Sequence, residues 1–102
     1  MLVNLTPHTL NIRMMDGEFI ELPSSGVARV ASNRELVGTQ DFVCLYSNSF
    51  GEVEGLPEPE VGVYYIVSLL VKQAAHRDDV LSPGTLIRNE AGQPIGCDGL
   101  NL

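Results

Sequence analysis

The stretch from Val63 to His76, Val-Tyr-Tyr-Ile-Val-Ser-Leu-Leu-Val-Lys-Gln-Ala-Ala-His, changes its periodicity halfway along. Residues Val63–Val67 are β-branched and aromatic, which is typical of a buried strand. Beyond them, the apolar residues recur with the spacing of one helix face. These apolar residues are Val67, Leu70, Val71 and Ala74. The pattern predicts a strand that runs directly into a helix of about two turns, with Ser68 as the N-cap.

On the C-terminal side of this stretch the sequence predicts a return to the core and then a hairpin. Val80-Leu81 is apolar, and Ser82-Pro83-Gly84 has the composition of a turn. Thr85 to Asn89 and Gln93 to Cys97 then flank Glu90-Ala91-Gly92, which is the arrangement of two strands around a short loop.

On the N-terminal side the sequence predicts another hairpin. Thr9 to Met15 and Glu18 to Leu22 alternate between apolar and polar residues and are separated by Asp16-Gly17. A two-residue Asp-Gly link favours a hairpin because both central positions require positive φ. Pro23 to Gly26 predicts a turn, and Val27 to Ala31 a short strand.

The middle of the chain is the least regular part of the sequence. Asn33 to Gln40 is polar and predicts irregular structure. Phe42 to Tyr46 predicts a strand, Ser47 to Gly51 a loop, and Glu52 to Glu54 a brief strand. Leu56-Pro57-Glu58-Pro59 predicts an extended surface connection, because prolines remove backbone donors and fix φ.

Together these segments predict an α+β fold that is predominantly β, with two or more β-hairpins in an antiparallel or mixed sheet and one short helix. The 102 residues fit a single small domain. We expect most aromatic residues at strand positions to lie in the core. Tyr64 and Tyr65 must face opposite ways, so one of them is available to a surface, a ligand or a partner subunit.

The chain carries a formal net charge of −7, from thirteen acidic and six basic side chains. This balance disfavours duplex nucleic-acid binding, which depends on contacts from Lys and Arg to phosphate. The acidic residues crowd between Glu52 and Glu60, whereas Lys72, Arg77 and Arg88 come from the C-terminal half. A locally positive pocket on an acidic protein is therefore compatible with the sequence.

The longest apolar run without a charge, Val61 to Val71, is too short to span a bilayer. The N-terminal residues lack the basic region and apolar stretch of a secretory signal. Cys44 and Cys97 have no metal or redox spacing. We therefore expect a cytoplasmic protein with two buried, reduced thiols and no membrane partner.

Ser68, at the junction of strand and helix, has two interpretations besides the plain helix cap. A helix N-terminus can bind an anion, and a serine after a strand can be a nucleophile. The nucleophile elbow requires glycines two residues either side of the serine. Ile66 and Leu70 occupy those positions, which argues against a hydrolase.

Arg77-Asp78-Asp79 offers either a carboxylate pair for a divalent cation or a guanidinium that clamps a phosphate or carboxylate. Pairing of Arg77 with a neighbouring aspartate, or with another subunit, is a further alternative. His8 and His76 have no local partner at zinc-ligand spacing. We predict no metal, no cofactor and no catalytic residues, and the prediction is of a non-enzymatic protein.

Six short segments spread along the chain form a characteristic combination. They are Asn4-Leu5-Thr6-Pro7-His8, Gly26-Val27-Ala28-Arg29-Val30, Gly55-Leu56-Pro57-Glu58-Pro59, Tyr65-Ile66-Val67-Ser68, Arg77-Asp78-Asp79-Val80 and Ile95-Gly96-Cys97. In this order they resemble small proteins encoded by tailed bacteriophages, prophages and their bacterial relatives, and the resemblance covers nearly the whole chain.

The resemblance implies a bacterial host cell as the location and an anti-defence role. One class of such phage proteins forms homo-oligomers that sequester the nucleotide messengers of bacterial immunity. For this chain the leading hypothesis is therefore a non-catalytic homo-oligomer that binds a small anionic, nucleotide-derived ligand. The candidate ligand-binding residues are Arg77, Arg88, Arg29, Ser68 and Tyr65.

Two alternatives remain open at this point. One is a protein-binding inhibitor of a host factor, or a small virion accessory protein, whose acidic segment from Glu52 to Glu60 meets a basic surface. The other is an enzyme that cleaves phosphodiesters with His8, His76 or Asp79 as acid or base.

Overall fold

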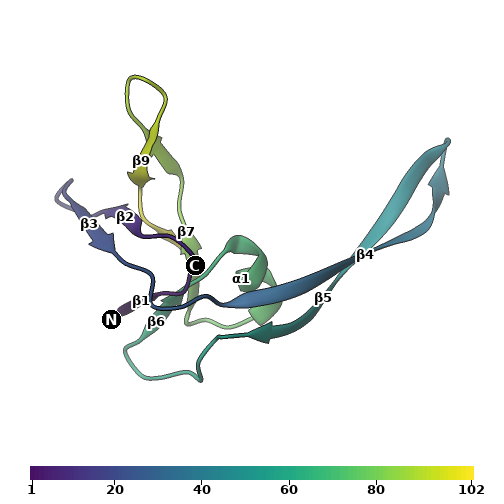
Figure 1. The fold of residues 1–102 in the computed structure, drawn as a ribbon, viewed down its shortest axis with the longest axis horizontal. Coiled ribbons are helices and arrows are strands. Elements are labelled where there is room, and N and C mark those ends of the chain that lie inside the picture. The colour runs from purple at the N-terminus through teal and green to yellow at the C-terminus, as the bar shows by residue number, and fades with distance from the viewer.

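The computed structural model describes residues 1–102 and contains ten β-strands and one short helix (Figure 1). The predicted α+β fold, predominantly β, is confirmed. In chain order the elements are β1 Leu2–Asn4, β2 Leu10–Arg13, β3 Phe19–Leu22, β4 Arg29–Gln40, β5 Val43–Glu54, β6 Tyr64–Ile66, α1 Leu69–Ala75, β7 Val80–Pro83, β8 Leu86–Arg88, β9 Pro94–Cys97 and β10 Leu100–Asn101. The helix is too short to cross a membrane, and the structure has no other.

The first sheet has four strands in the order β1-β6-β7-β10. Strand β6 pairs in parallel with both β1 and β7, and β7 pairs antiparallel with β10. Parallel neighbours require a crossover connection, and α1 supplies it between β6 and β7. The predicted strand that leads directly into a helix is thus confirmed, as is the return of Val80-Leu81 to the core. Ser82 and Pro83, predicted to turn, instead extend β7.

The second sheet has the order β3-β2-β9-β8 and is built from the two predicted hairpins. Strands β2 and β9 join the hairpins in parallel, with Ile12 opposite Cys97. The first hairpin turns through three residues, Met15–Gly17, because Met14 and Glu18 still pair through Met14 N–H and Glu18 O at 2.7 Å. The second turns at Glu90–Gly92, as predicted.

Strand β6 lies between two apolar clusters because its side chains alternate between the faces of the first sheet. Tyr65 points into a cluster with Leu5, Ala28, Val67, Val71 and Val80. Ile66 points into a smaller cluster with Ile12 and Cys97. The core of the molecule is therefore divided between the α1 side of this sheet and the side of the second sheet.

Asn4 is a buried polar residue that ties three segments together. Its Nδ2 donates to the carbonyls of His8 and Leu22, both at 2.8 Å. Its Oδ1 accepts from the backbone N–H of Thr6 at 2.9 Å and from the Thr6 hydroxyl at 2.7 Å. Because every polar atom of the amide is satisfied, burial of Asn4 to 2% exposure carries no unpaired group.

The main departure from the sequence prediction is a long hairpin of β4 and β5, twelve residues each. The segment 33–40, predicted irregular, and the segment 47–51, predicted as a loop, both belong to one antiparallel ladder, in which residues 33–40 pair with residues 43–49. Every residue from Ala31 to Glu52 is exposed, and this hairpin projects away from the rest of the molecule (Figure 1). We call residues 31–52 the arm.

The base of the arm packs on the molecule through Val30 and Val53, which face each other across the strands and contact the first cluster. Beyond this point the arm borders another element only at Phe50, which faces α1 across a groove, and within the arm the Arg34 guanidinium lies 3.6 Å from the centre of the Tyr46 ring. The radius of gyration is consequently 16.7 Å, whereas a compact chain of this length has about 13 Å.

Two further predictions were wrong because they assumed that strand residues are buried. Cys44 lies on the arm and is exposed, so only Cys97 is a buried free thiol. Tyr65 is the single buried aromatic residue. The prediction that Tyr64 and Tyr65 face opposite ways is confirmed, with 44% and 4% exposure.

Candidate functional site

Helix α1 is flanked by two features that orient its polar residues. At its start the Ser68 hydroxyl accepts a hydrogen bond from the Val71 N–H at 3.4 Å, which confirms Ser68 as the N-cap. At its end His76 adopts a left-handed conformation with φ 51° and ψ 46°. Lys72, in the last turn of α1, and His76, its C-cap, both lie on the side of the helix that lines one groove.

That side of α1 borders an open groove of about 730 Å³ between the helix and strand β5. We call it the α1 groove. Its lining is Phe50, Lys72, Gln73, His76, Arg77 and Asp78. Phe50 presents a ring that is 41% exposed, and Lys72 makes no ion pair within the chain.

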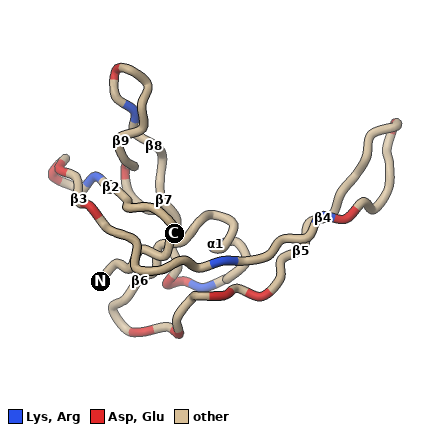
Figure 2. Tube along the Cα trace, in the orientation of Figure 1, with Lys and Arg blue, Asp and Glu red and all other residues tan.

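Two cationic side chains, Lys72 and Arg77, line the α1 groove beside one carboxylate, Asp78. Lys72 is the sole lysine of the chain, which otherwise has five arginines and thirteen acidic residues. Acidic positions gather instead at the base of β5 and along the connection from β5 to β6 (Figure 2). An exposed aromatic face beside a free ammonium group is a combination that suits a planar anion.

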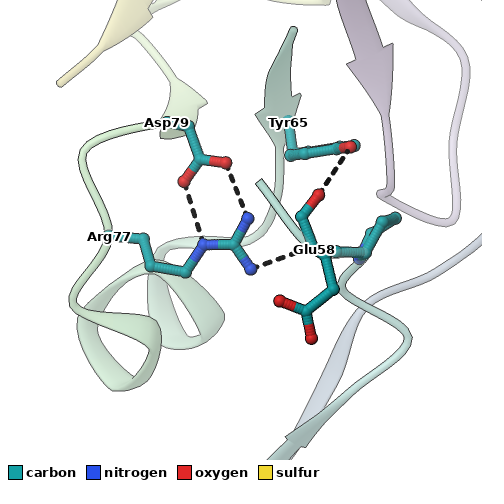
Figure 3. A network of polar contacts seen from close by, with 5 residues as sticks. Glu58, Tyr65, Arg77 and Asp79 are labelled. Atoms are coloured by element: carbon teal, nitrogen blue, oxygen red, sulfur yellow. Dashed lines mark hydrogen bonds and ion pairs between the residues drawn. The ribbon is translucent and has the colours of Figure 1, made fainter. Parts of the chain in front are cut away.

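Arg77 lies at one end of this groove in a fixed network (Figure 3). Its Nε and Nη2 donate to the two carboxylate oxygens of Asp79, at 2.9 and 2.6 Å. Its Nη1 donates to the Pro57 carbonyl at 2.8 Å. The neighbouring Tyr65 hydroxyl donates to the Glu58 carbonyl at 3.4 Å. The network thereby attaches the proline-containing connection to the end of α1.

The ion pair shifts the pKa values of both groups. Its hydrogen bonds to Arg77 hold the pKa of Asp79 below the usual range of a carboxyl group. The same hydrogen bonds raise the pKa of Arg77. Pairing with an aspartate of the same chain, one of the alternatives left open by the sequence, accounts for two of the three hydrogen bonds that the Arg77 side chain donates.

Arg29 and Ser68 meet at a different groove, on the other side of α1. This second groove has a volume of about 360 Å³ and a mainly apolar lining that includes Leu5, Val30 and Leu70. Arg29 is exposed and makes no ion pair, although Glu54 lies opposite it in the ladder. The Ser68 hydroxyl is already engaged in capping α1.

Arg88 belongs to neither groove. It lies on β8 and donates from Nη1 to the Gly92 carbonyl at 2.8 Å, across its own hairpin. The five sequence-predicted residues are thus distributed over three places. Arg77 and Tyr65 are neighbours, Arg29 and Ser68 share a groove, and Arg88 stands apart on β8.

Lys72, His76 and Phe50 line the α1 groove but were not among the ligand-binding residues predicted from the sequence. Lys72 was considered there as a source of local positive charge, and His76 as a candidate acid or base. The position of both residues at the C-terminal side of the predicted helix was a usable signal that they lie close together. Phe50 gave no such signal, because the segment around it was predicted to be a loop.

Metal-ligating side chains do not gather in this structure. No group of three or more His, Cys, Asp and Glu is close enough to hold an ion. His8 lies at a third groove, of about 400 Å³, with Pro83 and Cys97, whereas His76 borders the α1 groove. The alternative of a phosphodiesterase used His8, His76 or Asp79 as acid or base. The two histidines lie at separate grooves, and Asp79 is paired with Arg77, so the structure does not bring these three residues together.

Comparison with known proteins adds no relative. No protein-family model, no curated protein and no solved structure matches this chain. The resemblance to small phage proteins accordingly stays a prediction.

Proposed function

We propose that this protein is a non-catalytic binding protein that sequesters a small anionic, nucleotide-derived ligand in the α1 groove. The observation that carries the proposal is the grouping of Lys72, His76 and the exposed Phe50 ring around one open groove. Phosphate is attracted to the ammonium and imidazole groups, and a base stacks on the aromatic ring.

The charge of the rest of the chain favours a small ligand over a duplex at this groove. An acidic protein of net charge −7 repels a long polyanion, whereas one or two phosphates interact mainly with the nearest cations. The resemblance to phage proteins supplies the ligand class, the nucleotide messengers of bacterial immunity, and with it an anti-defence role in the host cell.

Lys72, rather than the sequence-predicted Arg77, is the main phosphate-binding residue of this proposal. Arg77 borders the groove but is held by Asp79 and Pro57, so it contributes fixed positive charge and two remaining N–H donors. Arg77→Ala would disturb the network along with the groove. Lys72 is the better residue for a test because its side chain makes no hydrogen bond or ion pair within the chain, and its one hydrogen bond is the helical one from its backbone N–H to the Ser68 carbonyl.

The test is native mass spectrometry of the purified protein mixed with cyclic nucleotides and ADP-ribose derivatives. We expect one ligand to add a fixed mass per chain and to be recovered chemically unchanged after denaturation. Lys72→Ala should weaken binding about tenfold or more, the loss expected for one charge-assisted contact. Arg13→Ala removes the same charge from an exposed strand position away from the groove and serves as the control.

His76→Gly is a second variant that separates binding from folding. Glycine adopts the left-handed conformation of position 76 without strain, so folding stability should be kept or increased by up to about 1 kcal/mol. Weaker binding in this variant would then reflect the lost imidazole. A protein that ignores the whole panel, or binds equally well without Lys72, would contradict the proposal.

A second candidate function is binding to another protein, the alternative that the sequence left open. The acidic segment from Glu52 to Glu60, whose glutamates are all exposed, favours it. Reversing these charges should slow association with a basic partner and reduce its salt dependence.

A further inference from the structure

The distal half of the arm, residues 36–46, exposes large apolar side chains to water on both of its faces. The register places Leu36 opposite Tyr46 on one face, while Leu45 lies opposite Gly38 on the other. Their exposures are 55% for Leu36, 43% for Tyr46 and 45% for Leu45, and Val43 beside them is 61% exposed. A two-stranded ribbon is marginally stable in water without a third strand or a covering layer.

The sequence of β5 has the composition of a strand that is covered on both faces. Val43-Cys44-Leu45-Tyr46 is an uninterrupted apolar run, whereas a strand with one wet face alternates with polar residues. The distal parts of the two strands, residues 36–40 and 43–46, contain no proline and no charged residue, which are the residues that protect free strand edges in solution. Both features indicate that the arm is buried when the protein works.

The surface area of the whole chain supports the same conclusion. It exposes 7303 Å², whereas a compact monomer of this mass exposes about 5,700 Å². The excess of about 1,600 Å² falls in the range that one subunit buries in an obligate homodimer, about 1,000–2,500 Å².

We propose that the distal halves of the arms of two copies of this chain pack on each other and form the subunit interface of a homo-oligomer. The proposal is independent of the ligand assigned to the α1 groove. The reason for a second copy is stability, because only 13 of the 102 residues are buried and the arm has no support of its own. A partner needed for folding must be present wherever the chain is made, and another copy always is.

Charge also favours contact through this part of the arm. Asp41 is the one charged residue between positions 36 and 46, so the remainder of the chain carries −6 of the total −7. Identical copies therefore repel each other elsewhere on their surfaces. Strands of twelve residues span about 40 Å. Contact near the tips of two arms therefore keeps the acidic parts of one copy farther from those of the other than the electrostatic screening length of about 8 Å.

The experiment is a mass measurement in solution, by light scattering or native mass spectrometry, on the full chain. We expect an oligomer, and a thermal midpoint that rises between about 1 µM and about 100 µM protein because assembly stabilises the folded chain. Leu45→Glu should reduce the mass to that of a single chain. Ser49→Glu, on the same face but nearer the base, introduces the same charge outside the proposed interface and should leave the mass unchanged.

Cross-linking of the wild-type chain tests the same interface even if Leu45→Glu fails to fold. Cys44 is exposed within the proposed interface and Cys97 is buried. A short bis-maleimide should therefore link two chains, and Cys44→Ser should abolish the product. A wild-type chain that is monomeric at about 100 µM and gives no linked dimer would overturn the proposal and assign the arm to a different protein.

Discussion

The hairpins β2–β3 and β4–β5 are both antiparallel pairs, but they differ in length and in burial. The first has strands of four residues, turns near Asp16-Gly17 and buries Ile12 to 5% exposure against β9. The second has strands of twelve residues, turns at Asp41-Phe42 and leaves all of positions 31–52 exposed. A hairpin therefore forms here in two contexts, one supported by a sheet and one supported by nothing in the chain.

The comparison teaches that the local strand signal and burial are separate properties. Ile12 and Leu45 are both apolar residues in ladders, but only Ile12 finds neighbours within its own molecule. Changes on the β2–β3 side should consequently affect the free energy of unfolding strongly. Changes on the arm should affect assembly instead.

The largest expected effect is at Asn4, whose amide holds the end of β3 through the Leu22 carbonyl. Asn4→Ala removes four hydrogen bonds from a buried site and leaves the Thr6 N–H without its acceptor, whereas the His8 carbonyl keeps the Thr6 hydroxyl as a donor. The free energy of unfolding should fall by about 3–4 kcal/mol. Urea denaturation measures it. Asn33→Ala, an exposed change on the arm, should shift stability by less than about 0.5 kcal/mol.

The next effect is at Gly55, where the arm rejoins the rest of the molecule. Gly55 has φ 80°, and a Cβ there would lie 2.5 Å from the Val27 carbonyl oxygen. Gly55→Ala should therefore destabilise by about 2–3 kcal/mol, from backbone strain plus the clash. Gly17→Ala has a similar φ of 88° with nothing within 4 Å, so it isolates the strain alone, about 1 kcal/mol. Equal losses in the two variants would show that the close approach to Val27 is absent.

A smaller effect is expected at the Arg77–Asp79 pair, which attaches the connection that follows the arm. Asp79→Asn should lower stability by about 1–2 kcal/mol near neutral pH. Because the folded pKa of Asp79 is lowered, this contribution is complete above the unfolded value of about 4 and disappears as the pH falls below it. Asp78 is exposed, and Asp78→Asn should change neither the stability nor its dependence on pH. A wild-type acid-unfolding curve that matches that of Asp79→Asn would contradict this role.

The smallest effect is at the turn of the arm. Phe42 has φ 66° and is fully exposed, so its ring adds no contact within the chain. Phe42→Gly creates an Asp-Gly turn and, in the dissociated chain, should raise the stability of the arm by up to about 1 kcal/mol. Hydrogen exchange of the β4 and β5 amides at about 1 µM protein reports this locally. Faster exchange in the variant at that concentration would contradict the prediction, whereas faster exchange only in the oligomer would show that the ring contributes to the proposed interface.

The sequence alone determined the structure of those segments in which it depends on residues close together in the chain. The change of period around Ser68 predicted strand β6 and helix α1, because capping and side-chain alternation depend on residues a few positions apart. The Asp16-Gly17 and Glu90–Gly92 turns predicted two hairpins for the same reason.

Only the tertiary structure decided the features that depend on pairing between distant parts of the chain. Asn33–Gln40 has little strand signal of its own and becomes a strand because β5 satisfies its backbone groups across the ladder. The α1 groove likewise required Phe50 to meet Lys72 and His76 from a distant part of the chain. Arg77 was found from the sequence, but its pairing with Asp79 and Pro57 depends on how the chain closes around α1. Burial and shared grooves are properties of contacts far apart in sequence, which no local pattern records.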